Sequence, residues 1–128
     1  MQYRRLGRTE LMVSEVGFGG HPIGGIGWGG VTDENSLAAL RRAFDLGVNF
    51  FDTADIYGRG HSEELIGQAL AEVRPNVVIA TKVGLDDTHG GFARSNFAPA
   101  YLRRALDKSL KRLRTDYIDV YQLHNPPQ

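Results

Sequence analysis

The amino-acid sequence predicts an α/β protein built around a parallel β-sheet. Strand-like and helix-like segments of ordinary length alternate along the chain, which is typical of right-handed βαβ units. One strand-like segment, residues 77–80, is apolar at every position, as expected for a parallel strand that is covered on both faces. The length of 128 residues suits one compact core. We therefore expect a single domain over residues 1–128.

The first fifteen residues predict a β-hairpin. Residues 3–6 and 12–14 are short strand-like segments on either side of Gly7-Arg8-Thr9, a plausible turn. Residues 16–20 then form a glycine-bounded segment, which we expect to be the first strand of the sheet. A glycine-rich loop follows as far as Gly30.

Three further strands and three helices are expected in residues 16–128. The strands are residues 48–51 before Asp52, residues 77–80 before Thr81 and Lys82, and residues 117–123 before His124. The helices are residues 36–46 with Thr32 or Asp33 as the cap and Gly47 as the stop, a second helix opened by Ser62, Glu63 and Glu64, and a third from near Pro99 to near Arg114. Apolar residues recur on one face of each helix, and these capping residues are typical of helix ends.

Charge and composition exclude several classes of partner. Fifteen basic residues balance fifteen acidic residues without a long run of like charge, which does not favour nucleic acid. The chain has no cysteine, which excludes disulfides, a thiolate nucleophile and thiolate-bound metals. No stretch is apolar over the length of a bilayer, so we expect a soluble, cytoplasmic protein without a membrane partner.

Four ionisable residues are expected to meet beyond the carboxyl ends of the strands, where proteins with parallel sheets place their active sites. Asp52, Lys82 and His124 follow three successive strands, and Tyr57 lies close enough after Asp52 to fold back over the strand ends. Taken singly, each residue is better explained as structural, for example as an ion pair or as cover for the core. Three successive strands that each end in a different ionisable residue are hard to explain by packing alone.

These residue types suit the delivery of a proton to a carbonyl oxygen. A phenol ordinarily has a pKa of about 10, and a neighbouring ammonium group lowers it towards working pH. Lys82 would supply that charge, and Asp52 would hold Lys82 in an ion pair. His124 would hydrogen-bond the carbonyl oxygen, and Tyr57 would act as the general acid.

The chain resembles the aldo-keto reductase family over essentially its whole length. The segments that carry the resemblance are residues 3–9 (YRRLGRT), 47–58 (GVNFFDTADIYG), 62–67 (SEELIG), 80–82 (ATK) and 116–124 (DYIDVYQLH). Asp52, Tyr57, Lys82 and His124 match the Asp, Tyr, Lys and His of the family's catalytic tetrad. The resemblance implies NADPH-dependent reduction of an aldehyde or ketone, or the reverse oxidation, with a proton from Tyr57.

The same resemblance implies a partial domain, the first half of a TIM (β/α)8 barrel, which has roughly 250 residues when complete. The hairpin over residues 1–15 resembles the one that closes the barrel bottom in this family, and residues 16–128 match its first four strands and three helices. The family's contacts to the adenosine phosphate come from later strands. From this half, Gly19, Gly20, Asp52 and Asn125 are expected to line the nicotinamide end of NADPH.

A rival interpretation starts from Gly25-Ile26-Gly27-Trp28-Gly29-Gly30, which matches the dinucleotide-binding pattern G-x-G-x-x-G. In that pattern the first glycine leaves a strand and the third begins a helix, so that backbone amides meet the pyrophosphate. Neither condition is met here, which favours a flexible substrate loop with Trp28 as an apolar wall. A tryptophan that only covers the barrel top is almost as good an interpretation.

Three histidines, His21, His61 and His89, lie in separate loops without the spacing of metal ligands, so we expect solvated side chains and no metal site. The loop of residues 86–91 has two open interpretations, a part in substrate choice or an ordinary exposed loop.

Two classes of function remain open. The first is a carbonyl reductase that is competent when the barrel is complete. The second is a non-catalytic nicotinamide-binding or interaction module, similar to the potassium-channel β subunits that share this fold, or an inactive fragment of a longer enzyme. The intact set of four residues favours the enzyme. A half barrel also leaves two sheet edges unpaired, so self-association or pairing with a complementing half barrel is expected.

Overall fold

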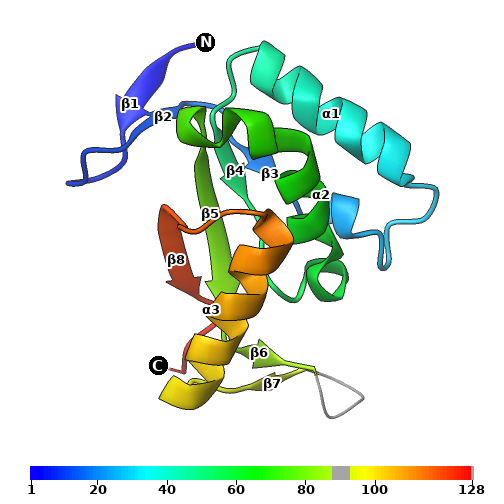
Figure 1. Cartoon of the computed structure of the whole chain (residues 1–128), viewed down its shortest axis with the longest axis vertical. Helices are drawn as coiled ribbons and strands as arrows, with labels where there is room; N and C mark the ends of the chain where they lie inside the picture. The colour runs from blue at the N-terminus through cyan, green and yellow to red at the C-terminus, as the bar shows by residue number, and fades with distance from the viewer. Residues whose placement is uncertain (88–92, 128) are drawn as a thin grey trace.

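A four-stranded parallel sheet forms the centre of the structure, a computed structural model that describes residues 1–87 and 93–127 (Figure 1). Its strands, in spatial order, are β3 (Phe18–Gly19), β4 (Phe50–Asp52), β5 (Val78–Val83) and β8 (Val120–Leu123). Its helices are α1 (Asp33–Asp45), α2 (His61–Leu70) and α3 (Pro99–Leu113), with short 3-10 segments η1 (Pro22–Gly24), η2 (Tyr57–Gly60) and η3 (Ala71–Asn76). The predicted α/β class with parallel βα units is confirmed.

The predicted N-terminal hairpin is also present. Its strands β1 (Tyr3–Arg5) and β2 (Met12–Ser14) pair antiparallel. Asn49, just before β4, ties the hairpin to the sheet, because its side chain accepts a hydrogen bond from the Ser14 backbone N–H at 2.6 Å and donates to the Met12 carbonyl at 2.9 Å. The hairpin therefore lies at the amino ends of the strands, away from their carboxyl ends (Figure 1).

The helix boundaries follow the local chemistry closely. Thr32, and not Asp33, caps α1, because its side chain accepts a hydrogen bond from the Asn35 backbone N–H at 3.2 Å. Pro99 occupies the first turn of α3, and Arg114 ends that helix in the left-handed conformation. The predicted start and end of α3 are thus both correct to within one residue.

The hydrophobic core lies between the helices and one face of the sheet. Its fully buried members include Phe51 of β4, Ile79 of β5, Leu40 of α1, Ile66 of α2 and Leu113 of α3. Successive strand residues point to opposite faces, so positions that alternate with these core residues face the interior of the half barrel. This alternation directs polar side chains away from the core and towards the candidate site.

The connection between β5 and α3 contains a small antiparallel pair, β6 (Leu85–Asp86) and β7 (Arg94–Ser95). Strands of two residues carry no periodicity, which is why the sequence did not indicate them. His89 and much of the loop of residues 86–91 lie outside the described residues.

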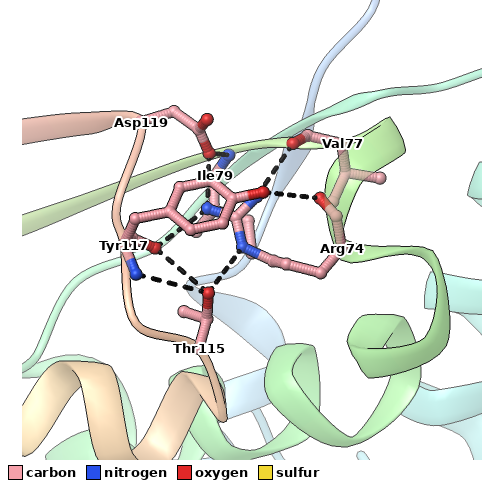
Figure 2. Close-up of polar contacts among 6 residues, drawn as sticks. All are labelled: Arg74, Val77, Ile79, Thr115, Tyr117 and Asp119. Carbon is pink, nitrogen blue, oxygen red and sulfur yellow. Dashed lines mark hydrogen bonds and ion pairs between the residues drawn. The ribbon is translucent and has the colours of Figure 1, made fainter.

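The fourth strand begins at Val120 and not at Tyr117 as predicted, because the residues before it bind Arg74 (Figure 2). The Arg74 guanidinium donates hydrogen bonds to the carbonyl of Tyr117 at 3.0 Å and to Asp119 Oδ2 at 2.7 Å. It also lies 3.9 Å from the centroid of the Tyr117 ring. Asp119 in turn accepts the backbone N–H of Ile79 at 2.9 Å. These side-chain contacts hold residues 117–119 in a conformation in which they do not pair with β5, and pairing begins at Val120.

Candidate active site

Lys82 and Asp52 form an ion pair at the carboxyl end of the sheet. Asp52 is the last residue of β4. Lys82 lies within β5, whereas the sequence predicted a strand that ended before it. The Lys82 Nζ atom is 2.6 Å from Asp52 Oδ2 and 2.8 Å from the carbonyl oxygen of Thr53. The Lys82 side chain is 16% exposed and that of Asp52 36% exposed. The ammonium is thus held in a largely desolvated position.

Tyr57 folds back over the strand ends as predicted. It is the first residue of η2, and its backbone N–H donates to the carbonyl of Ala54 at 3.1 Å, which closes the turn. Lys82 Nζ donates to the Tyr57 hydroxyl at 3.5 Å and lies 5.0 Å from the ring centroid. The phenol therefore has a positive charge beside its oxygen.

His124 lies against Tyr57 on the side of β8. Its backbone N–H donates to the Val83 carbonyl at 2.8 Å, and its ring meets the Tyr57 ring edge to face, with centroids 5.8 Å apart. Burial, with the Lys82 charge as a second cause, lowers the pKa of His124, so the imidazole is neutral at neutral pH. Its Nδ1 atom is buried without a hydrogen-bond partner among residues 1–87 and 93–127.

Gln122 belongs to the same cluster, although the sequence interpretation did not include it. Its Nε2 atom donates to Asp52 Oδ1 at 3.3 Å, so both oxygens of Asp52 are engaged. Gln122 stands opposite Lys82 in the register of β5 and β8, and two residues before His124. The period of two along a strand was the available signal, because it places Gln122 and His124 on the same face.

His21 also lies at the cluster, although the sequence interpretation did not place it there. It was expected to be a solvated loop histidine, and it is exposed, but its ring lies 4.5 Å from the Tyr57 ring and 5.5 Å from the Trp28 ring, between centroids. His61 also differs from that expectation, because it opens α2 and contacts Asp33 through Nε2 at 2.7 Å. No local sequence signal indicated either contact.

The other predicted site residues differ in how closely they are packed and how exposed they are. Gly19 ends β3 with open space where a side chain would lie, whereas Gly20 is packed, since a Cβ there would be 2.7 Å from Ser62 Oγ. Asn125 is exposed with a φ of +52°. Trp28 is 46% exposed, and its ring meets that of His21 edge to face.

The glycine-rich loop does not have the geometry of a dinucleotide-binding turn. Gly25 follows η1 and not a strand, and α1 begins at Asp33, three residues after Gly30. The helix start and the strand end that the G-x-G-x-x-G pattern requires are therefore separated by η1 and the loop. The structure thus agrees with the sequence argument against this rival.

The model of the aldo/keto reductase family matches residues 15–128 of this sequence. The chain belongs to the aldo/keto reductase family. It is 43% identical over 127 residues to the uncharacterized oxidoreductase YqkF of Bacillus subtilis, and the match covers 97% of this chain and 39% of that protein. The chain thus spans about two fifths of the length of the relatives it matches.

Solved structures of the family share this arrangement. The holo form of aldo-keto reductase AKR11C1 from Bacillus halodurans matches with a TM-score of 0.88 and 38% identity, over 97% of this chain and 40% of that one. An aldo-keto reductase from Klebsiella pneumoniae, solved in complex with NADPH, matches with a TM-score of 0.75 and 33% identity, over 91% of this chain and 37% of that one. The fold described here is therefore half of an aldo-keto reductase barrel.

Within the part of the chain that the structure describes, no group of three or more His, Cys, Asp or Glu side chains is arranged to hold a metal ion. Among those same residues, no helix has both the length and the apolar character needed to cross a membrane.

Proposed function

We propose that this chain supplies the proton-delivery site of an NADPH-dependent carbonyl reductase, which converts an aldehyde or ketone to an alcohol or catalyses the reverse oxidation. The observation that carries the proposal is the chain of contacts from Asp52 through Lys82 to the Tyr57 hydroxyl, with His124 beside it. Each of these groups has a chemical part in adding a proton to a carbonyl oxygen.

Tyr57 is the proposed proton donor. When it gives its proton to the carbonyl oxygen of the substrate, a phenolate forms, and the Lys82 ammonium 3.5 Å away stabilises that negative charge. Asp52 holds the Lys82 ammonium in place, and Gln122 holds the second oxygen of Asp52. Asp52 and Gln122 therefore act through Lys82 and are positioning residues.

His124 is the proposed electrostatic partner of the carbonyl oxygen. Because its pKa is lowered, the ring is neutral and keeps one N–H donor without adding a competing acid to the site. A fixed N–H aimed at the oxygen stabilises the charge that develops there as the carbonyl is reduced.

The described residues fit the reacting end of the cofactor. The open space beside Gly19 leaves room for a flat ring at the end of β3, and Gly19, Asp52 and Asn125 are the residues proposed to contact it. Gly20 contributes through packing instead, since its backbone N–H donates to the Asp52 carbonyl at 2.7 Å. The hydride for the carbonyl carbon would come from NADPH when it is bound there. The NADPH complex of the Klebsiella pneumoniae relative supports this choice of cofactor.

The substrate is proposed to be a small aldehyde or ketone that approaches from the side of the glycine-rich loop. Trp28 and His21 offer aromatic rings there, and the His21 ring already lies tilted against the Tyr57 ring. This placement supports a part for Trp28 in the substrate wall.

The test is NADPH oxidation with a panel of aldehydes and ketones, comparing the wild-type chain with Tyr57→Phe. We expect the substitution to lower turnover by about 10²- to 10⁴-fold, the usual contribution of a general acid. Tyr121→Phe is the matched control. It removes the same hydroxyl group from a tyrosine that lies on β8, the strand beside β5, and is 37% exposed. Equal rates for wild type and Tyr57→Phe would remove Tyr57 as the donor. Failure of the wild-type chain to bind NADPH would favour the interpretation as an inactive fragment of a longer enzyme.

A further inference from the structure

A cavity separate from the candidate active site opens between the loop after β4, the start of β6 and one face of α3. It has a volume of about 280 Å³. Asp55 and Ile56 line it from the loop, Leu85 from β6, and Tyr101 from α3, where the Tyr101 hydroxyl donates to the Leu85 carbonyl at 3.1 Å. Asp52, Tyr57, Lys82 and His124 are all described and do not line it. In Figure 1, β6 and β7 lie beside the amino-terminal half of α3.

Three basic residues of α3 face this cavity at intervals of four residues. Arg112 is occupied, since its guanidinium binds Glu63 Oε2 at 2.6 and 2.7 Å. Arg104 and Lys108 line the cavity and make no hydrogen bond or ion pair with any residue in the ranges 1–87 and 93–127. Like charges four residues apart destabilise a helix, so an anion between them would relieve a repulsion.

The acidic residues of the cavity cancel part of this positive charge. Asp87 is paired with Arg59 at 3.3 Å, and Asp86 accepts a hydrogen bond from the neutral Asn96 amide at 3.1 Å, which leaves its negative charge in place. Burial, and next the nearby Glu63, raise the pKa of Asp55 to about 7, so this carboxyl carries only part of a negative charge at neutral pH. Four basic residues therefore line the cavity against three carboxyl groups, of which Asp55 is partly neutral, so the positive charge exceeds the negative charge.

We infer that this cavity binds a small phosphate monoester, with Arg104 and Lys108 holding the phosphate. A phosphate dianion matches the two cations in charge, and both side chains bind phosphate readily in proteins. The volume is close to the lower limit of about 300 Å³ for small-molecule pockets, which leaves room for an organic group beside the phosphate. Ile56, Leu85 and the Tyr101 ring would contact that group. The site is independent of the proposed carbonyl reduction.

The experiment is titration of the 128-residue chain with glycerol 3-phosphate by isothermal calorimetry, without NADPH. We expect the double variant Arg104→Gln/Lys108→Gln to bind at least about tenfold more weakly, because it loses two charged hydrogen bonds. Arg103→Gln/Lys111→Gln changes the same net charge on the same helix away from the cavity, and its affinity is expected within about twofold of wild type. Inorganic phosphate should bind more weakly than the ester.

Three results would overturn the inference: no binding to the wild-type chain, equal weakening in both double variants, or inorganic phosphate binding as tightly as the ester. Circular dichroism of each variant separates a lost site from a lost fold. If the cavity variant does not fold, amide shifts of the wild-type chain on titration decide, since Arg104 and Lys108 must move and His124 must not. Tyr57→Phe should bind the ester normally, so this test is separate from that of the carbonyl reductase.

Discussion

At the scale of single residues, the surroundings of Lys82 decide what its charge can do. A lysine ammonium has three N–H donors, and here Asp52, the Thr53 carbonyl and the Tyr57 hydroxyl accept them. Because all three donors are used, the ammonium has no free direction in which to turn. An arginine would present a wider planar fork and could not reproduce these three contacts, so Lys82→Arg is not a conservative change at this position.

His61 provides a residue-scale prediction of pH dependence. A hydrogen bond from its Nε2–H to the Asp33 carboxylate raises the pKa of His61 above the ordinary 6.5, with a further contribution from Glu64, whose Oε2 is 3.4 Å from Nδ1. Because the folded pKa is the higher one, this contribution to stability is fully present below about pH 6.5 and is lost as the pH rises through the folded pKa. We expect His61→Gln to cost about 0.2–1 kcal/mol at pH 5.5, as for an exposed pair, and less at pH 8.5.

Urea unfolding of the wild type and His61→Gln between pH 5.5 and 8.5 measures this effect. Asp33→Asn removes the main cause of the raised pKa and should flatten the pH dependence while leaving the imidazole in place. A difference between wild type and His61→Gln that stays constant or grows with pH would contradict the assignment.

At the scale of elements, the approach of η1 to η2 shapes the candidate site. Gly58 has a φ of +61°, and a Cβ there would lie 2.2 Å from the carbonyl oxygen of Gly24. The two backbones therefore touch directly after Tyr57. This contact holds η1, and with it His21, against the Tyr57 ring. The left-handed conformation favours a glycine at this position, and the close approach requires one.

Gly58→Ala is expected to destabilise the chain by more than about 1 kcal/mol, because a left-handed alanine is strained and its methyl group meets the Gly24 carbonyl. The free energy of unfolding in urea is the measurement. Gly29→Ala is the control, since a Cβ there meets nothing within 4 Å, and a change within about 0.5 kcal/mol is expected. Equal effects in the two variants would mean that the backbone around Gly58 shifts at little cost to accommodate the methyl group.

At the scale of the whole molecule, stability and the candidate chemistry lie at opposite ends of the sheet. The cluster around Arg74 joins η3, the start of β5 and the segment before β8 at the amino ends of the strands (Figure 2). The Arg74 and Asp119 side chains are 8% and 13% exposed, so the two charges are largely shielded from solvent. Such separation is usual in barrels, where one end carries the loops of the active site and the other supports the fold.

Removing one partner of this buried pair is expected to cost about 3–5 kcal/mol, because the remaining charge stays buried without compensation. A double-mutant cycle of Arg74→Met and Asp119→Asn, measured by urea unfolding, should show strong coupling, with the double variant less destabilised than the sum of the single ones. The exposed pair Arg5 and Glu10 is the control and should couple by less than about 1 kcal/mol. Additive effects at Arg74 and Asp119 would contradict this account.

The sequence alone determined the α/β class, the order of strands and helices, the hairpin, and the set of four ionisable residues that meet at the strand ends. These properties are local, since apolar periodicity, capping residues and the polar residue after each strand can all be read along a short stretch of chain. The motif around Asp52 and Tyr57 also sufficed to indicate the aldo/keto reductase family, which the family model then showed.

Only the tertiary structure decided which atoms meet. It showed that Gln122 hydrogen-bonds Asp52 and that the His21 ring packs against the Tyr57 ring. It also showed that Glu63 of α2 is buried beside Arg112 of α3, and that β8 begins only after the residues that bind Arg74. These contacts join residues that are far apart in the sequence, and a side chain's partner depends on how helices and strands pack. No local period encodes that packing, so the geometry of the candidate site and the charged cavity beside α3 could not be read from the sequence.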